Sequence, residues 1–590
     1  MAKQSKRKEI VLDGLGVSPG IAIGAAYIRE HGAVDVPERQ IAKKEIDSEC
    51  RRIDGAAERA IKVNARLRAK SAKMPASAAA ELDILVSAYD AMLRDSRLLR
   101  GAKQRIAEEL LNAEAALHYE INAVAQVFAA MDDAYIASRV DDIREVGRRL
   151  LLTLTRTPVK PFASVPEGSV LVSDELTPAD TARLDSGRIA GAAAVLGGAE
   201  GHTAILARAI GLPTVLGVGE LLGNVKQGDT VMIDGTTGRV VVNPSKQTVQ
   251  AAERTSKQYR KQSRQLERIR DLAAETRDGV AIHLQANVEL PVEMDLVQSA
   301  GAEGIGLLRT EFMFMNRDDV PDEDEQVEML RSIVERAPGP VTIRTLDIGG
   351  EKPARALMAG LDEKATSALG MRGIRLSLHE PAVLETQMRA ILRVAAEADR
   401  DHAVRILLPM VSTVGEVRRA RDILNKAAAK LKRRKVALPD PMPALGVMIE
   451  VPGAALAADA LARNADFFAI GSNDLTMYTL AIDRSNEYVA GLYDPLHPAV
   501  LRLVQFSAGA AQRAGIPVSI CGEMAGDPRF TPLLVGLGFR ELSMAAQSIP
   551  KVKQRVRKMD SVSAERRAQQ IMDQVDPGRI AALIDDFSDS

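Results

Sequence analysis

The sequence contains no tryptophan, few other aromatic residues and only two cysteines. Aromatic side chains make up 3% of the 590 residues, which argues against a surface that stacks nucleic-acid bases. Cys50 and Cys521 lie far apart along the chain, so we expect no disulfide framework and favour a reducing compartment.

The chain also lacks a charge excess and a long apolar run. It has 78 Lys+Arg and 79 Asp+Glu, a formal net charge of −1, so no overall field attracts nucleic acid or an anionic surface. No stretch reaches the roughly 18–20 apolar residues of a membrane span. The basic N-terminus is not followed by the apolar segment of a signal peptide. We expect no nucleic-acid partner, no membrane insertion and a cytoplasmic location.

A chain of this length predicts three or four domains. Strand-like segments broken by Gly and Pro occur at 9–30 and again at 158–243. Between them, residues 43–154 have few Gly or Pro and a helical spacing of apolar residues, which predicts about four packed helices. We therefore expect an α/β domain formed by 1–42 and 155–244, with a helical bundle inserted at 43–154.

The rest of the chain is predicted to be a connecting helix and a barrel. Residues 245–275 are polar and glycine-free with interleaved acidic residues, which favours a solvated connecting helix over a nucleic-acid-binding arm. Over residues 276–590, eight strand-like runs alternate with helical patterns, which fits a (β/α)8 TIM barrel. The runs are AIHLQANV, GIGLLRT, VTIRTLD, RILLPMV, GVMIEVP, FFAIGSN, VSICGEM and ELSMAAQ.

Polar side chains cluster where these predicted strands end, which is where such barrels carry their active sites. The set is Arg309, Arg344, Asp347, Glu450, Asn473, Asp474, Arg484 and Cys521. Arginine binds phosphate or carboxylate through paired donors, and two of the carboxylates, Glu450 and Asp474, offer hard oxygens to Mg²⁺. Cys521 could serve as a proton donor or nucleophile. Taken singly, each arginine could be a surface ion pair and the cysteine a core thiol. Together they predict a site for a small phosphorylated acid with Mg²⁺.

One of the seven histidines lies in the segment GGAEGHTAILAR at 197–208. His202 follows a glycine-rich loop and precedes an apolar, helix-forming run. A neutral imidazole is a nucleophile, and a helix N-terminus favours a phosphoryl group. The loop is not a Walker loop, because no Lys-Ser/Thr follows it. The segment therefore predicts a phosphoryl-accepting histidine.

These motifs resemble the enzyme I family of the phosphotransferase system, the phosphoenolpyruvate–protein phosphotransferases. The resemblance runs from SPGIAIG at 18–24 to about residue 550. It rests on GGAEGHTAILAR, GIGLLRTEFMF, IRTLDIGGEKP, LLPMVSTVGE, GVMIEVPGA, FFAIGSNDLTMYTLAIDR and ICGEMAGDP.

The resemblance implies a role for each candidate residue. His202 would carry the phosphoryl group, and Cys521 would protonate the enolate to give pyruvate. Glu450 and Asp474 would hold Mg²⁺. The residues that would bind phosphoenolpyruvate are Arg309, Arg344, Asn473, Asp474 and Arg484. It also implies that the α/β domain is a phosphohistidine domain and that the helical bundle docks a phosphocarrier such as HPr or a paralogue. It further implies that two chains form a homodimer through their barrels, and that a swivel about 245–275 brings His202 to the barrel.

The sequence departs from the family pattern at three places. Glu200-Gly201 stands before the histidine where the family commonly has Thr-Ser, Tyr89 stands where it usually has a histidine, and Thr366-Ser367 replaces an Asn-Pro. Two other functions stay open: a non-catalytic regulator that senses phosphoenolpyruvate, and an enzyme like a dikinase or phosphoenolpyruvate synthase without its ATP domain. Sugar uptake and a regulatory phosphorelay would use the same chemistry.

Overall fold

The computed structural model describes most of the chain in two compact units, residues 1–262 and 263–590. Each unit has hydrophobic cores of its own. The described residues are 9–29, 36–71, 82–83, 86–87, 89–94, 96–129, 140–155, 165–181, 184, 187–198, 202–314, 319–348, 369–398, 402–482, 489 and 491–588.

The first unit contains an eight-stranded sheet in the order β1-β8-β7-β3-β4-β5-β6-β2. β3 to β6 are parallel neighbours, while β1, β2, β7 and β8 pair antiparallel. The strands are β1 (Ile10–Asp13), β2 (Leu15–Ser18), β3 (Ile21–Arg29), β4 (Ser169–Ser173), β5 (Ile189–Ala194), β6 (Thr214–Leu216), β7 (Thr230–Asp234) and β8 (Arg239–Val242). Short helices α7 (Pro178–Thr181), α8 (His202–Ala209) and α9 (Leu221–Asn224) connect them.

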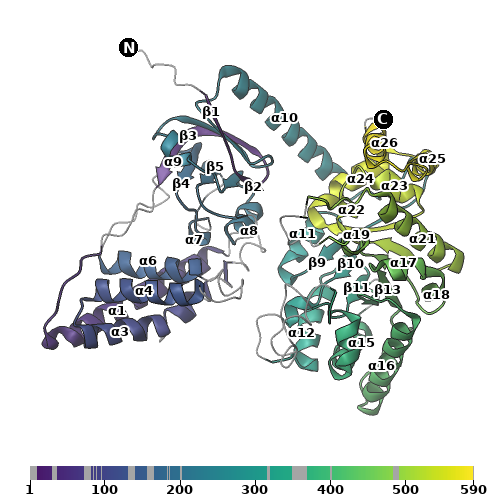
Figure 1. The fold of residues 1–590 in the computed structure, drawn as a ribbon, viewed down its shortest axis with the longest axis horizontal. Coiled ribbons are helices and arrows are strands. Elements are labelled where there is room, and N and C mark those ends of the chain that lie inside the picture. Colours follow the sequence, from purple (N-terminus) through teal and green to yellow (C-terminus); the bar gives the residue numbers. More distant parts are fainter. Residues whose placement is uncertain are drawn as a thin grey trace. The chain divides into compact units, whose positions relative to one another are not determined.

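A helical bundle interrupts this sheet between two neighbouring strands. Ala26 of β3 pairs with Val170 of β4, and the bundle occupies the chain between them (Figure 1). Its described helices are the 3₁₀ turn Lys43–Glu45, α1 (Ile46–Ser71), α3 (Arg97–Glu109), α4 (Ala113–Ala129) and α6 (Val140–Leu154). The expectation of an α/β domain with an inserted helical bundle is confirmed.

The bundle has an apolar core. Ile53, Ile106, Leu117 and Leu150 are fully buried in it, as expected for helices with one apolar face. Tyr89 is 1% exposed, and the guanidinium carbon of Arg149 lies 5.1 Å from its ring centroid. The residue at the family's histidine position is therefore a core side chain.

A single long helix, α10 (Lys246–Ile269), contains the boundary between the two units. The first turns of α10 contact the sheet of the first unit. The Glu9 carboxylate accepts hydrogen bonds from the Ser245 N–H and, at 2.7 Å, from the Thr248 hydroxyl. Ala252 packs with Met232 of β7 and Val241 of β8.

The second unit is a closed barrel of eight parallel strands, in the order β9 to β16 with β16 returning to β9. The strands are β9 (His283–Val288), β10 (Ile305–Leu308), β11 (Val341–Arg344), β12 (Val404–Leu408), β13 (Leu445–Ile449), β14 (Phe468–Ile470), β15 (Val518–Ile520) and β16 (Glu541–Ala545). Each overlaps one of the eight runs predicted from the sequence, with β12 and β13 beginning one residue before their runs, so the predicted TIM barrel is confirmed.

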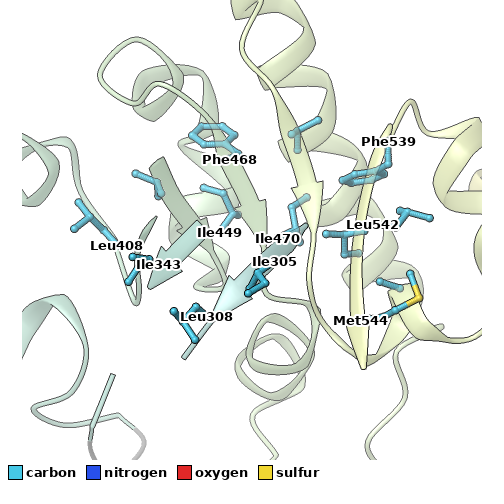
Figure 2. Close-up of a cluster of buried hydrophobic side chains, with 14 of the residues drawn as sticks. Ile305, Leu308, Ile343, Leu408, Ile449, Phe468, Ile470, Phe539, Leu542 and Met544 are labelled. Carbon is cyan, nitrogen blue, oxygen red and sulfur yellow. The ribbon is translucent and has the colours of Figure 1, made fainter. Parts of the chain in front are cut away.

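Successive strand residues belong to two different layers of apolar packing. One set, which includes Ile305, Leu408 and Ile470, packs into the large core shared with the surrounding helices (Figure 2). The intervening residues Leu407 and Ala469 form a smaller cluster with Leu307, Met448, Phe467 and Cys521. This alternation follows from side chains pointing to opposite faces of a strand. It assigns Cys521 to the layer inside the barrel.

Helices cover the outside of the barrel. They are α11 (Met294–Ser299), α12 (Glu323–Val334), α14 (Ile374–His379), α15 (Pro381–Glu397), α16 (Val414–Arg433), α17 (Pro452–Leu456), α18 (Ala458–Ala462), α19 (Ser472–Leu480), α21 (Pro498–Ala514), α22 (Glu523–Gly526), α23 (Thr531–Gly536), α24 (Ile549–Lys558), α25 (Ser561–Met572) and α26 (Pro577–Ser588), with 3₁₀ turns at Pro291–Glu293, Glu311–Met313 and Ala546–Ser548. Within the described ranges, no helix combines the length and the apolar character needed to cross a bilayer.

Candidate active site at the strand ends of the barrel

A cavity of about 590 Å³ opens at the C-terminal ends of the barrel strands. Its lining includes Asn287 of β9, Arg309 after β10, Asn473 on α19, and Cys521 with Gly522 after β15. Three of the residues singled out in the sequence therefore line one cavity. This is the face where barrel enzymes bind their substrates.

Arg309 provides a donor that the described residues leave unused. Its backbone N–H donates to the Val288 carbonyl at 2.9 Å, which fixes the residue beside β9. One terminal nitrogen lies 3.6 Å from a Glu289 oxygen. Its Nε is buried and has no hydrogen-bond partner among the described residues. A guanidinium in this state is suited to bind an anion.

Arg344, the last residue of β11, is held by two buried carboxylates. Its Nη2 donates to Glu311 Oε1 at 2.8 Å, and its Nη1 lies 3.0 Å from Asp347 Oδ2. Burial alone would lower the pKa of Arg344, but the Glu311 and Asp347 charges raise it above its usual value. The Nε of Arg344 is also buried without a partner in the described structure. Arg344 is thus a permanent, oriented cation.

Glu450 follows β13 and is 2% exposed. Its Oε1 accepts a hydrogen bond at 2.5 Å from the backbone N–H of Met410, which has a left-handed φ of 58°. At the end of β14, a Cβ on Gly471 would lie 2.8 Å from Glu450 Oε2, so a larger residue there would displace the carboxylate. Burial, together with the nearby Asp474 and Asp347 charges, raises the pKa of Glu450 to about 8.

The crowding of Glu450 and Asp474 fits a divalent cation. Asp474 lies in the first turn of α19 after β14, the strand next to β13. Like charges held together in a buried site disfavour ionisation, and a bound cation reverses that penalty. The described residues contain no cluster of three or more His, Cys, Asp or Glu able to hold a metal. Two carboxylates suit Mg²⁺, which takes its other ligands from water and substrate oxygens.

The surroundings of Cys521 favour its protonated thiol form. It follows β15 and is 4% exposed, with its Sγ 3.5 Å from the Ile470 carbonyl oxygen. Its own carbonyl accepts from Asn287 Nδ2 at 2.9 Å. Burial, and next the Glu450 charge, raises the pKa of Cys521 to about 12. Of the two roles left open by the sequence, this environment favours the proton donor over the thiolate nucleophile.

Asn473 is tied to the neighbouring strand end. Its Nδ2 donates to Glu523 Oε1 at 3.0 Å, and its Oδ1 accepts from the Glu523 N–H at 2.9 Å. Glu523 begins α22 after β15. The pair fixes the amide at the edge of the cavity.

His202 belongs to the other unit, where it is the first residue of α8. The loop before it contains Gly197 at a φ of 124°, where a Cβ would approach Leu216 to 3.0 Å. The helix is secured by the Thr203 hydroxyl, which donates to the Leu176 carbonyl at 2.7 Å. The histidine therefore begins an anchored helix, as the sequence predicted. Glu200-Gly201, Thr366-Ser367 and Arg484 lie outside the described residues.

Sequence reasoning missed several residues around the predicted ones, among them Glu311, Arg372 and Tyr478. Glu311 accepts from both Arg344 and, at 3.1 Å, the Asp347 N–H. It could have been found, because it stands two residues after Arg309. Tyr478 is four residues after Asp474 on α19, so it shares a helix face with that residue. Arg372 comes just before α14, well beyond the end of β11, and no local pattern marks it.

The chain matches family models along most of its length. They are described as the N-terminal domain of PEP-utilising enzymes at residues 13–139, their mobile domain at 165–238 and their PEP-binding domain at 263–561.

Curated relatives match the chain from end to end. The phosphoenolpyruvate-protein phosphotransferase of Cupriavidus necator is 38% identical, over 97% of this chain and 98% of its own. The protein of the same name from Geobacillus stearothermophilus is 37% identical, over 95% of each chain. That from Bacillus subtilis is 35% identical, over 97% of this chain and 99% of its own. A solution NMR structure of an Enzyme I protein is 30% identical with a TM-score of 0.36, covering 42% of this chain and 99% of that one.

Proposed function

The chain belongs to the phosphoenolpyruvate-protein phosphotransferase family, and from that premise we propose that it takes the phosphoryl group of phosphoenolpyruvate onto His202. The group then passes to a histidine of a small phosphocarrier, HPr or a paralogue, and pyruvate is released. The observation that carries the proposal is the set of arginines, carboxylates and a protonated thiol that follow the barrel strands, in a chain similar to these enzymes along its whole length.

The barrel residues bind and orient the substrate. Arg309 and Arg344 each have a buried Nε donor without a partner in the described structure, and these donors suit the phosphate and carboxylate groups of phosphoenolpyruvate. Asn473 and Arg484 complete the anion site, together with the backbone of Asp474. Glu450 and Asp474 would hold Mg²⁺, which supplies charge neutralisation for the phosphoryl oxygens when bound.

The chain's own residues then carry out two steps. A neutral imidazole nitrogen of His202 forms a bond to phosphorus as the bond from phosphorus to the enol oxygen breaks, which leaves the enolate of pyruvate. The Cys521 thiol donates its proton to the methylene carbon of that enolate, and the thiolate regains a proton from solvent. A thiol with a pKa of about 12 is fully protonated before each turnover.

The candidate residues lie in different units, and this supports a separate role for each domain. Residues 1–42 and 155–244 would form the phosphohistidine domain, 43–154 the phosphocarrier-binding bundle, 245–275 the linker and 276–590 the substrate-binding barrel. Because His202 and the barrel residues belong to different units, transfer requires a swivel about the linker. We include in the proposal a homodimer joined through the barrels and a cytoplasmic location.

The test is incubation of the protein with phosphoenolpyruvate labelled at phosphorus, Mg²⁺ and candidate phosphocarriers from the same cell. The wild type should acquire acid-labile label and pass it on to one carrier. His202→Ala should acquire none, because the nucleophile is gone. His283→Ala is the matched control, since this exposed histidine pairs with Glu303 at 3.0 Å at the start of β9; it should label normally.

Stoichiometric labelling of His202→Ala would refute the histidine assignment. Binding of phosphoenolpyruvate without any label in the wild type would instead favour the non-catalytic regulator. A dikinase-like enzyme without its ATP domain would take label onto His202 and release pyruvate, but would pass no label to any carrier. Retention of His202, Cys521 and Glu450 leads us to prefer the phosphotransferase.

A further inference from the structure

Arg372 uses all three of its guanidinium nitrogens at the barrel mouth. Its side chain is 14% exposed. Nε donates to Asp347 Oδ1 at 3.2 Å, and Nη2 donates to Asp347 Oδ2 at 2.9 Å. Nη2 also donates to Asp474 Oδ2 at 3.0 Å, and Nη1 to the Tyr478 hydroxyl at 3.2 Å. Planar, multidentate contact of this kind requires the arginine fork, which lysine lacks.

These contacts join the two halves of the site. Asp347 lies three residues after Arg344 at the end of β11, and the two side chains are 3.0 Å apart. Asp474 lies in the first turn of α19, after β14. In the barrel order, β12 and β13 lie between β11 and β14. A single guanidinium therefore connects the aspartate that orients a substrate-binding arginine with an aspartate suited to the metal.

Stability alone is a weak explanation for such an arrangement. Burying charged partners costs desolvation that their attraction often fails to repay. Partners behind the direct ligands of a metal, in contrast, set the orientation of those ligands and commonly change metal affinity by about 10–100-fold when mutated. The Tyr478 hydroxyl is an uncharged partner that limits where the fork can lie.

We propose that Arg372 is a positioning residue, braced by Tyr478, that holds Asp474 in place for Mg²⁺ and Asp347 in place for Arg344. The inference rests on the proposed function. It adds that the metal and substrate halves of the site are coupled through one side chain, so that the loss of its fork weakens both together.

The test measures binding rather than turnover. Full-length His202→Ala serves as the parent protein, because it cannot consume phosphoenolpyruvate. Mn²⁺ is titrated with and without phosphoenolpyruvate, and free Mn²⁺ is read by electron paramagnetic resonance. Adding Arg372→Lys should weaken Mn²⁺ binding in the presence of phosphoenolpyruvate by about 10–100-fold. Tyr478→Phe, which removes one hydrogen-bond acceptor, should weaken it by about 2–10-fold.

Arg331→Lys is the matched control. Arg331 makes a similar two-point contact with Glu397, at 2.7 and 2.8 Å, between α12 and α15 on the outside of the barrel. The control should bind Mn²⁺ as the parent does. Equal weakening by Arg331→Lys would overturn the inference, because a general loss of stability would then explain the effect.

Parent-like Mn²⁺ affinity in folded Arg372→Lys would also overturn it. If Arg372→Lys fails to fold, as judged by circular dichroism, Tyr478→Phe decides: unchanged Mn²⁺ affinity overturns the inference, and reduced affinity supports it. Failure of the parent itself to bind Mn²⁺ with phosphoenolpyruvate would refute the proposed function, and the inference with it.

Discussion

At the scale of single residues, the site contains an acidic group whose ionised form is destabilised by its surroundings. Glu450 is buried beside Asp474 and Asp347, and its pKa is raised to about 8. Near neutral pH the folded protein therefore holds a proton on this carboxyl that the unfolded chain has released. The proton has to leave when a cation binds, so folding and metal binding place opposite demands on one side chain.

Replacement of Glu450 by glutamine separates these demands. The usual pKa of this group is 4.5 and the folded value is about 8, so the folded state binds more protons and stability falls as pH rises through this interval. Glu450→Gln mimics the protonated acid and removes that cost. We expect the variant to be about 0.5–2 kcal/mol more stable near pH 7, with the gain vanishing below about pH 4.5.

The same variant should lose activity by about 100-fold or more, because a proposed ligand of Mg²⁺, the ion that would stabilise developing charge, is gone. Thermal unfolding between pH 4 and 9 and label uptake from phosphoenolpyruvate check the two halves. A variant less stable than the wild type at pH 8 would contradict the cost assigned to the carboxyl.

Cys521 carries a second prediction at this scale. The thiol is inside the barrel, and its pKa of about 12 keeps it protonated across the working range of pH. Cys521→Ala should slow pyruvate formation by about 10²–10⁴-fold, the usual contribution of a positioned general acid. Transfer from pre-phosphorylated enzyme to the carrier should change little, since no enolate forms in that step. Rapid-quench measurement of both half-reactions tests this; equal slowing would indicate a structural cysteine.

The predictable part of the site follows from position along a strand. Arg309, Glu450 and Cys521 each come directly after an apolar run, and parallel strands bring such positions to one face of the barrel. Arg372 could not be inferred this way, since the chain reaches the site again only after leaving β11. Nor could the sequence show that Cys521 would be protonated, because that depends on burial among side chains from several strands.

At the scale of secondary-structure elements, partly buried ion pairs join helices around the barrel. Glu323 begins α12 and accepts from Arg389 at 2.6 Å and Arg393 at 2.8 Å, both on α15. Arg434, directly after α16, donates to both of its oxygens at 2.6 and 2.8 Å. Burial alone would raise the pKa of Glu323, but the arginines lower it to about 2.

Glu323→Gln should therefore destabilise the barrel by about 1–3 kcal/mol near neutral pH, because partly buried arginines lose their counter-charge. A lowered pKa contributes stability above the usual 4.5 that is lost as pH falls towards 2, so the difference from the wild type should shrink in acid. Urea unfolding at pH 7 and pH 3 measures both. Glu397→Gln breaks an exposed pair between α12 and α15 and should lower the free energy of unfolding by no more than about 1 kcal/mol. An equal loss in Glu323→Gln and Glu397→Gln would contradict the importance of burial.

The elements were more predictable than their connections. Eight apolar runs became eight strands because each is a short β-type segment whose fully buried residues pack on both faces, as in β12 and β13. Repetition of strand and helix then left a barrel as the simple solution. The sequence did not show that one acidic residue would join three helices, since Glu323 and Arg434 are remote in sequence and each resembles an ordinary surface charge.

At the scale of the whole molecule, the proposed functional residues are divided between two compact units. The first contains His202 and the helical bundle, and its sheet and bundle have separate apolar cores. The second contains every proposed substrate and metal residue. The boundary lies within α10, whose first turns are part of the first unit through Glu9 and Ala252.

A fragment of residues 1–262 should therefore fold alone and exchange phosphoryl groups with a phosphorylated carrier, but not accept them from phosphoenolpyruvate. It retains the proposed nucleophile and carrier-binding bundle and lacks Arg309, Arg344 and Glu450. Ending the fragment at residue 245 removes the Thr248 hydroxyl that donates to Glu9 at 2.7 Å and the packing of Ala252, so this shorter form should melt at a lower temperature. Labelling each fragment from phosphoenolpyruvate and from the labelled carrier, with circular dichroism for melting, makes the comparison. Direct labelling of the 1–262 fragment by phosphoenolpyruvate would show that the barrel is not the donor site. A folded fragment that takes no label from any carrier would refute the proposed carrier-binding role of the bundle.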